Sequence, residues 1–135
     1  MALIKSKMVQ GLTPVPTSGF AGVVVAQRAQ HKLAAAALAN DIVEIGILPA
    51  RHYLVSIKSL ADGLTLGDIG IMSGKPDDPD SGRSIETVVV TTGAINDAGV
   101  KLAPVEYDRS IGVTIGTGGA AIGKEPRLLI TYAQG

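Results

Sequence analysis

The feature that most constrains the fold is a series of short segments in which aliphatic residues alternate with polar or small ones. A period of two is typical of a β-strand with one buried face. Strands are expected over residues 20–27, 41–48, 53–60, 64–72, 85–91, 100–102, 110–115 and 127–132. Roughly eight short strands, bounded by turn residues, predict an all-β fold: an antiparallel β-sandwich of jelly-roll type.

Three of the expected strands carry a glycine between β-branched residues, namely Gly46, Gly70 and Gly112. The period of two places all three opposite the branched aliphatic side chains, on a face expected to be open. Glycine weakens a strand and usually marks a bulge, a bend or the close approach of another backbone. Two explanations remain: tight bends under bulky neighbours, or a bare surface where the backbone of a partner comes close.

The positions of apolar residues, odd or even along the strand, give more detailed predictions for two strands. Between residues 64 and 72 the apolar pattern changes parity, which predicts a bulge near Gly67 and Asp68. In the strand over 53–60, Tyr53, Val55 and Ile57 are expected to point inward. The same parity turns His52 towards solvent.

The segment over residues 28–39 contains four consecutive alanines but no clear amphipathic stripe. Alanine has the highest helix propensity, so a short helix and a strand that continues into a turn remain equally open here.

Residues 1–19 are expected to form an extended N-terminal arm, and residues 20–135 the sandwich domain. Pro14 and Pro16, with nearby glycines, interrupt any regular element and favour an extended, unpaired backbone. A frayed tail is the alternative. The arm is favoured because a tail in water has no need of its apolar residues, which are Leu3, Ile4, Met8, Val9 and Leu12.

The composition excludes several function classes. Hydrophobic residues make up 46% of the chain but aromatic residues only 3%, so the core must be aliphatic and no base-stacking platform is expected. The net charge is zero, which argues against binding of nucleic acid. The chain has no cysteine, and no apolar run approaches the roughly 20 residues that a membrane span needs.

The glycine-rich segment Gly118–Lys124 resembles the first part of a phosphate-binding loop. The complete motif continues with Ser or Thr and then a helix, whereas Glu125, Pro126 and a strand-like run follow here. We therefore expect a glycine-rich hairpin loop between two strands, and no bound nucleotide.

No other residues form a recognisable catalytic or metal-binding pattern. Asp77, Asp78 and Asp80 fit a solvated turn better than a calcium loop, although ion binding there stays open. His31 and His52 are the only histidines, and both are expected to be exposed. The sequence predicts no catalytic residue, metal, cofactor or small-molecule substrate, and thus no enzyme.

Three segments, taken in order, resemble the capsid decoration or cement proteins of tailed bacteriophages: Asn40–Ala50, Gly67–Gly74 and Asp108–Val113. The likeness covers most of residues 20–132 and is strongest to the cement proteins of short-tailed Bordetella phages. The resemblance implies a jelly-roll sandwich without enzymatic activity that binds the outside of an icosahedral head. The implied partners are the major capsid protein and a second copy of the chain, with a homodimer favoured over a trimer.

The predicted function is that of a structural virion protein on the outer surface of the capsid, made in the cytoplasm of the bacterial host. A small jelly-roll module that binds carbohydrate or a receptor is the alternative, which the shortage of aromatic residues disfavours. No contact with nucleic acid or a membrane is expected. The candidate capsid or subunit interface comprises Leu3, Ile4, Lys5, Lys7, Met8, Val9, Leu12, Gly46, Gly70 and Gly112.

Overall fold

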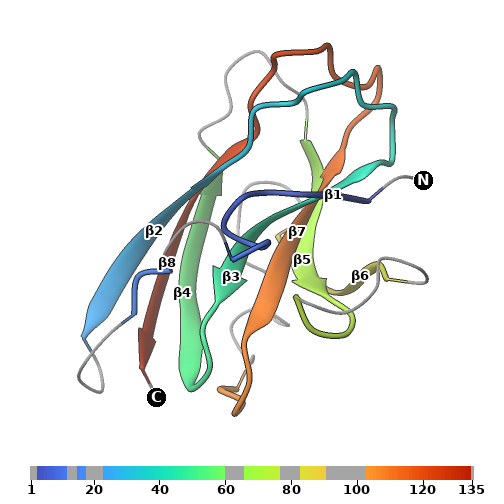
Figure 1. Ribbon diagram of the computed structural model, residues 1–135. Coiled ribbons are helices and arrows are strands. Elements are labelled where there is room, and N and C mark those ends of the chain that lie inside the picture. Colours follow the sequence, from blue (N-terminus) through green and yellow to red (C-terminus); the bar gives the residue numbers. More distant parts are fainter. Residues whose placement is uncertain are drawn as a thin grey trace.

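The computed structural model describes residues 3–11, 15–17, 23–59, 66–76, 83–90 and 103–134. These residues form two β-sheets packed face to face (Figure 1). The strands are β1 (Leu3–Lys5), β2 (Val24–Gln30), β3 (Ile42–Leu48), β4 (His52–Ser59), β5 (Leu66–Met72), β6 (Ile85–Val90), β7 (Arg109–Ile115) and β8 (Arg127–Gln134).

The larger sheet has the strand order β1-β3-β7-β5-β6, and the smaller sheet has the order β2-β8-β4. Every pair is antiparallel except β1 with β3, which is parallel. The prediction of an all-β sandwich is confirmed. The finer jelly-roll assignment stays a prediction.

The strand ends agree with the sequence patterns within a few residues, and the expected strand over 100–102 lies outside the described residues. The alternatives for residues 28–39 are decided, because β2 runs on to Gln30 and no helix follows. The chain instead continues without regular structure and forms one isolated bridge, between Ala37 and Ala120.

The core between the sheets is aliphatic, as the composition predicts. It includes Val43, Ile45, Ile111, Val113, Leu128 and Ile130, all fully buried. Each such side chain contributes roughly 1.5–3 kcal/mol through the hydrophobic effect. The largest buried side chain is Tyr132, whose ring meets the His52 ring edge-on at a centroid distance of 5.4 Å.

Three of the register shifts between paired strands decide how the sequence predictions of side-chain direction turn out. The register between β5 and β7 shifts between Leu66 and Ile69, which confirms the predicted bulge near residues 67–68. A second bulge shifts β4 against β8 between Leu54 and Ser56. It leaves Val55 43% exposed and His52 only 4% exposed, so both parity predictions there are wrong.

The third bulge lies in β3, between Glu44 and Gly46. The prediction that the glycine side of this strand forms an open face is wrong. All seven residues of β3 are buried. The shift turns Gly46 towards the smaller sheet, where an added Cβ would lie 2.7 Å from Ile130 Cδ1 and 2.8 Å from Gln27 Oε1.

The other two glycines are also packed against their own chain. A Cβ at Gly70 would clash with the backbone of Thr87, and one at Gly112 would clash with the sulfur of Met72. All three positions are buried. The bare surface for the backbone of a partner is therefore not found, and close packing within the chain explains the glycines.

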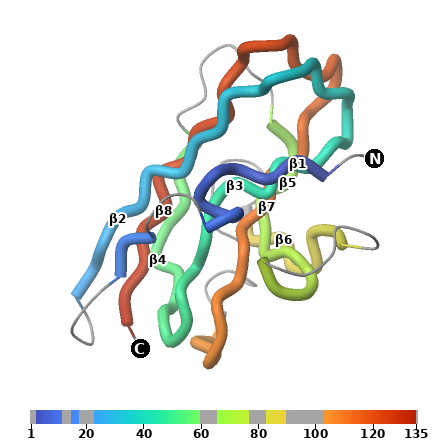
Figure 2. Tube along the Cα trace, in the orientation of Figure 1, coloured from blue at the N-terminus to red at the C-terminus, as the bar shows by residue number. Residues whose placement is uncertain are grey.

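The glycine-rich segment over residues 118–124 joins β7 in the larger sheet to β8 in the smaller one. It is therefore a crossover between sheets, and the predicted hairpin loop is wrong. Figure 2 shows it running beside the segment that follows β2. Leu33 N donates to Lys124 O at 2.9 Å, and Gly123 N donates to Leu33 O at 2.9 Å.

Candidate interaction surface

The N-terminal segment is fastened to the edge of β3. The parallel pairing of β1 with β3 runs from Leu3 opposite Ile42 to Lys5 opposite Glu44. Ser6 then continues the edge, because its N–H donates to the Glu44 carbonyl at 2.9 Å and its hydroxyl to the Ile45 carbonyl at 2.8 Å. Residues 3–6 of the predicted arm thus complete an edge of the larger sheet.

Gln27 continues this edge by means of its side chain. Its Nε2 donates to the Ile47 carbonyl at 2.8 Å, and Ile47 N donates to Gln27 Oε1 at 3.1 Å. The amide thereby takes the place of a paired strand and satisfies backbone groups that would otherwise be unpaired. Gln27 Nε2 also donates to the hydroxyl of Tyr132 at 3.0 Å, and that hydroxyl donates to the carbonyl of Pro16.

A buried ion pair lies on the face of the larger sheet that is turned away from the smaller one. Arg83 Nη1 donates to Glu44 Oε2 at 2.9 Å, and Arg83 Nη2 donates to Glu44 Oε1 at 2.6 Å. The Ser110 hydroxyl donates to the same carboxylate, and Arg83 Nε donates to the Ser73 carbonyl at 3.0 Å. This two-point geometry gives each buried charge a direct partner and joins the segment before β6 to β3 and β7.

A groove of about 880 Å³ opens between the N-terminal segment, the end of β2 and the crossover before β8. Its apolar lining includes Met8, Leu33 and Ile122, and the Ile122 side chain is 68% exposed. Its basic residues outnumber its one acidic residue, Glu125. The basic residues are Lys5, Lys7, Arg28, His31 and Lys32.

Three of the charged or titratable side chains of the groove interact with other parts of the chain. Lys5 Nζ donates to the Pro76 carbonyl at 3.2 Å, and Glu125 Oε1 lies 3.4 Å from Arg127 Nε. Burial lowers the pKa of His31, although Glu125 opposes this, so the imidazole is largely neutral at pH 7.

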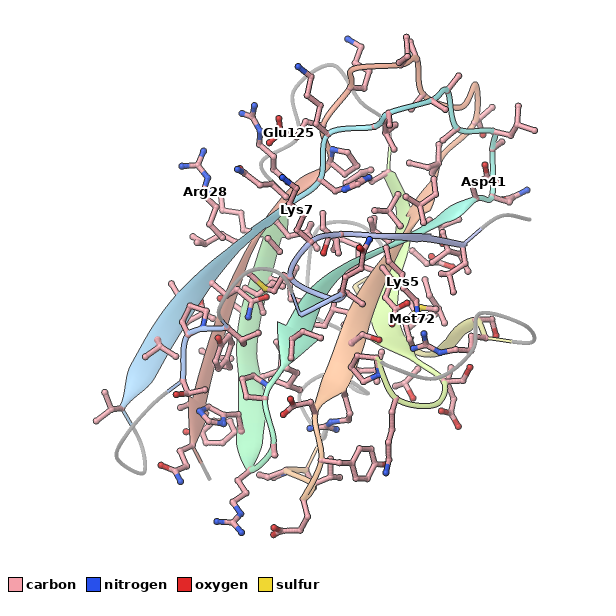
Figure 3. The ribbon with its side chains drawn as sticks, viewed as in Figure 1. Lys5, Lys7, Arg28, Asp41, Met72 and Glu125 are labelled. Carbon is pink, nitrogen blue, oxygen red and sulfur yellow. The ribbon has the colours of Figure 1, made fainter. Side chains whose placement is uncertain are left out.

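The exposed side chains of Lys7, Arg28 and Lys32 carry much of the positive charge of the groove. Figure 3 shows Lys7, Arg28 and Glu125 near the same end of β2. Because the whole chain has no net charge, this is a local concentration of positive charge rather than a general property.

The structure places the predicted interface residues in different settings. Leu3, Ile4 and Lys5 form the half-buried strand β1, Val9 is buried, and Leu12 lies outside the described residues. The groove brings Lys5, Lys7 and Met8 together. The three glycines lie elsewhere and are buried.

Sequence reasoning missed Arg28, Lys32 and His31. The last of these is half-buried rather than exposed as expected. A signal was present, because three of the five residues from 28 to 32 are Arg, His or Lys. It was obscured by the ambiguity between helix and strand over residues 28–39.

The described residues offer no metal site, since no group of three or more His, Cys, Asp or Glu side chains comes together among them. Asp77, Asp78 and Asp80 lie outside the described residues. In the part of the chain that the structure describes, no helix is long and apolar enough to cross a membrane.

No family model and no curated protein matches the chain. A solved structure, the capsid of Ralstonia phage GP4, does match it. That similarity extends over 99% of each chain, with 34% sequence identity and a TM-score of 0.87. The chain belongs to this family of phage capsid proteins. As a capsid protein it is a structural component of the virion and not an enzyme.

Proposed function

We propose that this capsid protein binds the outer surface of an icosahedral phage head and cements neighbouring major capsid protein subunits. The observation that carries the proposal is the similarity over nearly the whole chain to a protein in the capsid of Ralstonia phage GP4. The resemblance of three segments to cement proteins of tailed phages, including those of Bordetella phages, adds support for the cementing role.

The groove beside the N-terminal segment is the proposed contact surface, and an acidic, partly apolar segment of the major capsid protein is its proposed occupant. Lys7, Arg28 and Lys32 supply positive charge, while Met8 and Ile122 supply apolar surface. Charge complementarity of this kind increases the rate and specificity of association. Repetition around a closed shell would then add the effect of many modest contacts.

The test uses heads that lack this protein. Purified protein is added, and the bound fraction is measured by co-sedimentation. The wild type should bind, and the heads should withstand a higher temperature before they release DNA. A triple variant, Lys7→Glu, Arg28→Glu and Lys32→Glu, should bind at least about tenfold more weakly, since each reversed charge would repel an acidic partner.

The matched control is Lys58→Glu, an exposed charge reversal on β4, at the opposite edge of the smaller sheet from β2. It should bind like the wild type. Failure of the wild type to bind heads would contradict the cementing function. Normal binding by the folded triple variant would contradict the groove as contact surface while leaving the function intact.

The expected homodimer stays a prediction. Light scattering of the isolated protein at several concentrations would measure its mass directly, and a monomeric mass throughout would contradict the dimer.

A further inference from the structure

Arg109 is a buried cation at the start of β7, opposite Leu48 of β3. It is only 6% exposed, and strand alternation places it on the same side of the sheet as the core residues Ile111 and Val113. An arginine in such a position must lose most of its hydration, which is unfavourable unless protein groups replace the lost hydrogen bonds.

The hydrogen bonds of Arg109 are incomplete. Its Nη2 donates to the His52 carbonyl over a long 3.4 Å, and its Nε, which is closed off from solvent, has no hydrogen-bond partner among the described residues. Burial lowers the pKa of Arg109, although the electrostatic interaction with Tyr107 opposes this.

The acidic residues nearest in sequence are engaged elsewhere. Asp108 Oδ1 accepts a hydrogen bond from Ala50 N at 2.8 Å, and Glu106 Oε2 pairs with Arg51 Nε at 2.9 Å. Both contacts fasten residues 106–108 to the turn between β3 and β4. Neither carboxylate forms an ion pair with Arg109 within the described part of the chain.

Arg109 lines a pocket of about 220 Å³ together with Lys75 and Tyr107. Lys75 Nζ lies 5.4 Å from the centre of the Tyr107 ring, so a second cation stands at this pocket. Glu86, which is exposed, is the one acidic side chain among the described lining residues. A pocket of this volume is large enough for a small ion.

We propose that the pocket at Arg109 binds an oxyanion, either a carboxylate or a phosphate-sized ion, which pairs with the positive charge of the guanidinium. Lys75 contributes a second positive charge. Two sources share this chemistry: a free ion such as phosphate, and an acidic side chain of a neighbouring capsid chain. The site is distinct from the groove, so this proposal does not depend on the proposed function.

The test measures the melting temperature of the isolated protein in sodium phosphate, sodium acetate and sodium chloride at equal ionic strength. Phosphate or acetate should raise the melting temperature by about 5 °C at ten times the dissociation constant, whereas chloride should not. A stronger effect of phosphate favours the free ion. A stronger effect of acetate favours the carboxylate of a neighbour.

Two variants locate the effect. Arg109→Met should abolish the anion-dependent shift, and Lys75→Met should weaken the apparent affinity about tenfold, as expected for loss of one charge-assisted contact. Lys58→Met, on the other sheet, is the control and should respond like the wild type.

Equal shifts in all three salts would overturn the proposal, as would an unchanged response in Arg109→Met. Lys75 is exposed, so Lys75→Met should fold even if Arg109→Met does not. An unchanged affinity in that variant would then overturn the site.

Discussion

Two buried arginines that pack against the larger sheet, Arg83 before β6 and Arg109 in β7, have nearly the same exposure, 5% and 6%, but very different surroundings. Arg83 makes two short contacts with the Glu44 carboxylate and a third with the Ser73 carbonyl. Among the described residues, Arg109 makes one long contact, with a backbone carbonyl. Burial alone therefore does not indicate whether a charge is compensated within the chain.

The difference separates a charge that is paired within the chain from one that has no counter-ion among the described residues. Around Arg83, β3, β7 and the segment after β5 each supply an acceptor, so the ion pair holds parts of the chain together. Near Arg109, the carboxylates of Glu106 and Asp108 are turned to the β3–β4 turn. We infer that the first site is complete in the isolated protein and that the second is completed by an external anion.

The largest effect is expected for Arg83→Met, which leaves Glu44 buried without its counter-ion. The free energy of unfolding, measured by urea denaturation, should fall by about 3–5 kcal/mol. The double variant Glu44→Leu with Arg83→Met removes both charges and should recover much of that loss. If the double variant is as unstable as the single one, packing rather than charge pairing explains the role of Arg83.

A smaller effect is expected for Ser110→Ala. The Ser110 hydroxyl donates to Glu44 and accepts from Arg83 Nη2 at 3.2 Å, so its loss leaves both charged groups with one partner fewer. The free energy of unfolding should fall by about 1–3 kcal/mol. Ser59→Ala, at an exposed position on β4, is the control. Equal effects of the two substitutions would contradict a special role for the buried network.

Arg109→Met should change the free energy of unfolding by no more than about 1 kcal/mol in a chloride buffer. Removing an under-paired charge relieves its desolvation cost, which offsets the lost contact with the His52 carbonyl. Urea denaturation of the Arg109→Met and Arg83→Met variants under the same conditions compares the two losses of unfolding free energy directly. A loss as large as that of Arg83→Met would show that Arg109 is already compensated within the chain.

The smallest effect concerns His31, a partly buried base with no ion pair among the described residues. Its pKa is lowered in the folded state, so the unfolded chain binds the proton more tightly. The stability that this residue contributes is fully present above the unfolded pKa of about 6.5 and is lost as the pH falls through the lowered folded value.

The measurement is the pH dependence of stability between pH 8 and pH 5 for the wild type and for His31→Gln. The variant should lose slightly less stability than the wild type over this interval. The opposite difference would mean that the attraction of Glu125 exceeds the effect of burial.

The strands could be predicted from sequence because aliphatic alternation is local and strong. The patterns around residues 42–48 and 109–115 gave nearly correct strand ends. The absence of a strong amphipathic stripe over 28–39 agrees with the absence of a helix there, although four alanines made a helix plausible.

The orientation of side chains was less predictable, because a β-bulge inserts one residue and reverses all that follow. The bulge in β5 changes the visible apolar pattern, so it was found. The bulges beside Glu44 and Leu54 lie where both parities contain apolar residues, and they gave no signal. As a result, Gly46 and His52 were expected at the surface but are buried.

The two arginine sites could not be predicted at all. Glu44 and Arg83 are 39 residues apart, and Ser110 comes another 27 residues later. Only the fold brings them together. The groove is similar in this respect, since its lining comes from residues 5–10, 28–34 and 122–125.

The bond from Tyr132 to Pro16 has a consequence for how the protein is made. It joins positions 116 residues apart, and β1 pairs with a strand about 40 residues further along. The ribosome therefore releases the N-terminal segment long before all of its partners exist. Contacts this distant in sequence also close slowly. The contact of Pro16 with Tyr132 thus forms only after β8 has been made, and a chain that ends earlier would lack both this contact and the part of the groove that residues 122–125 supply.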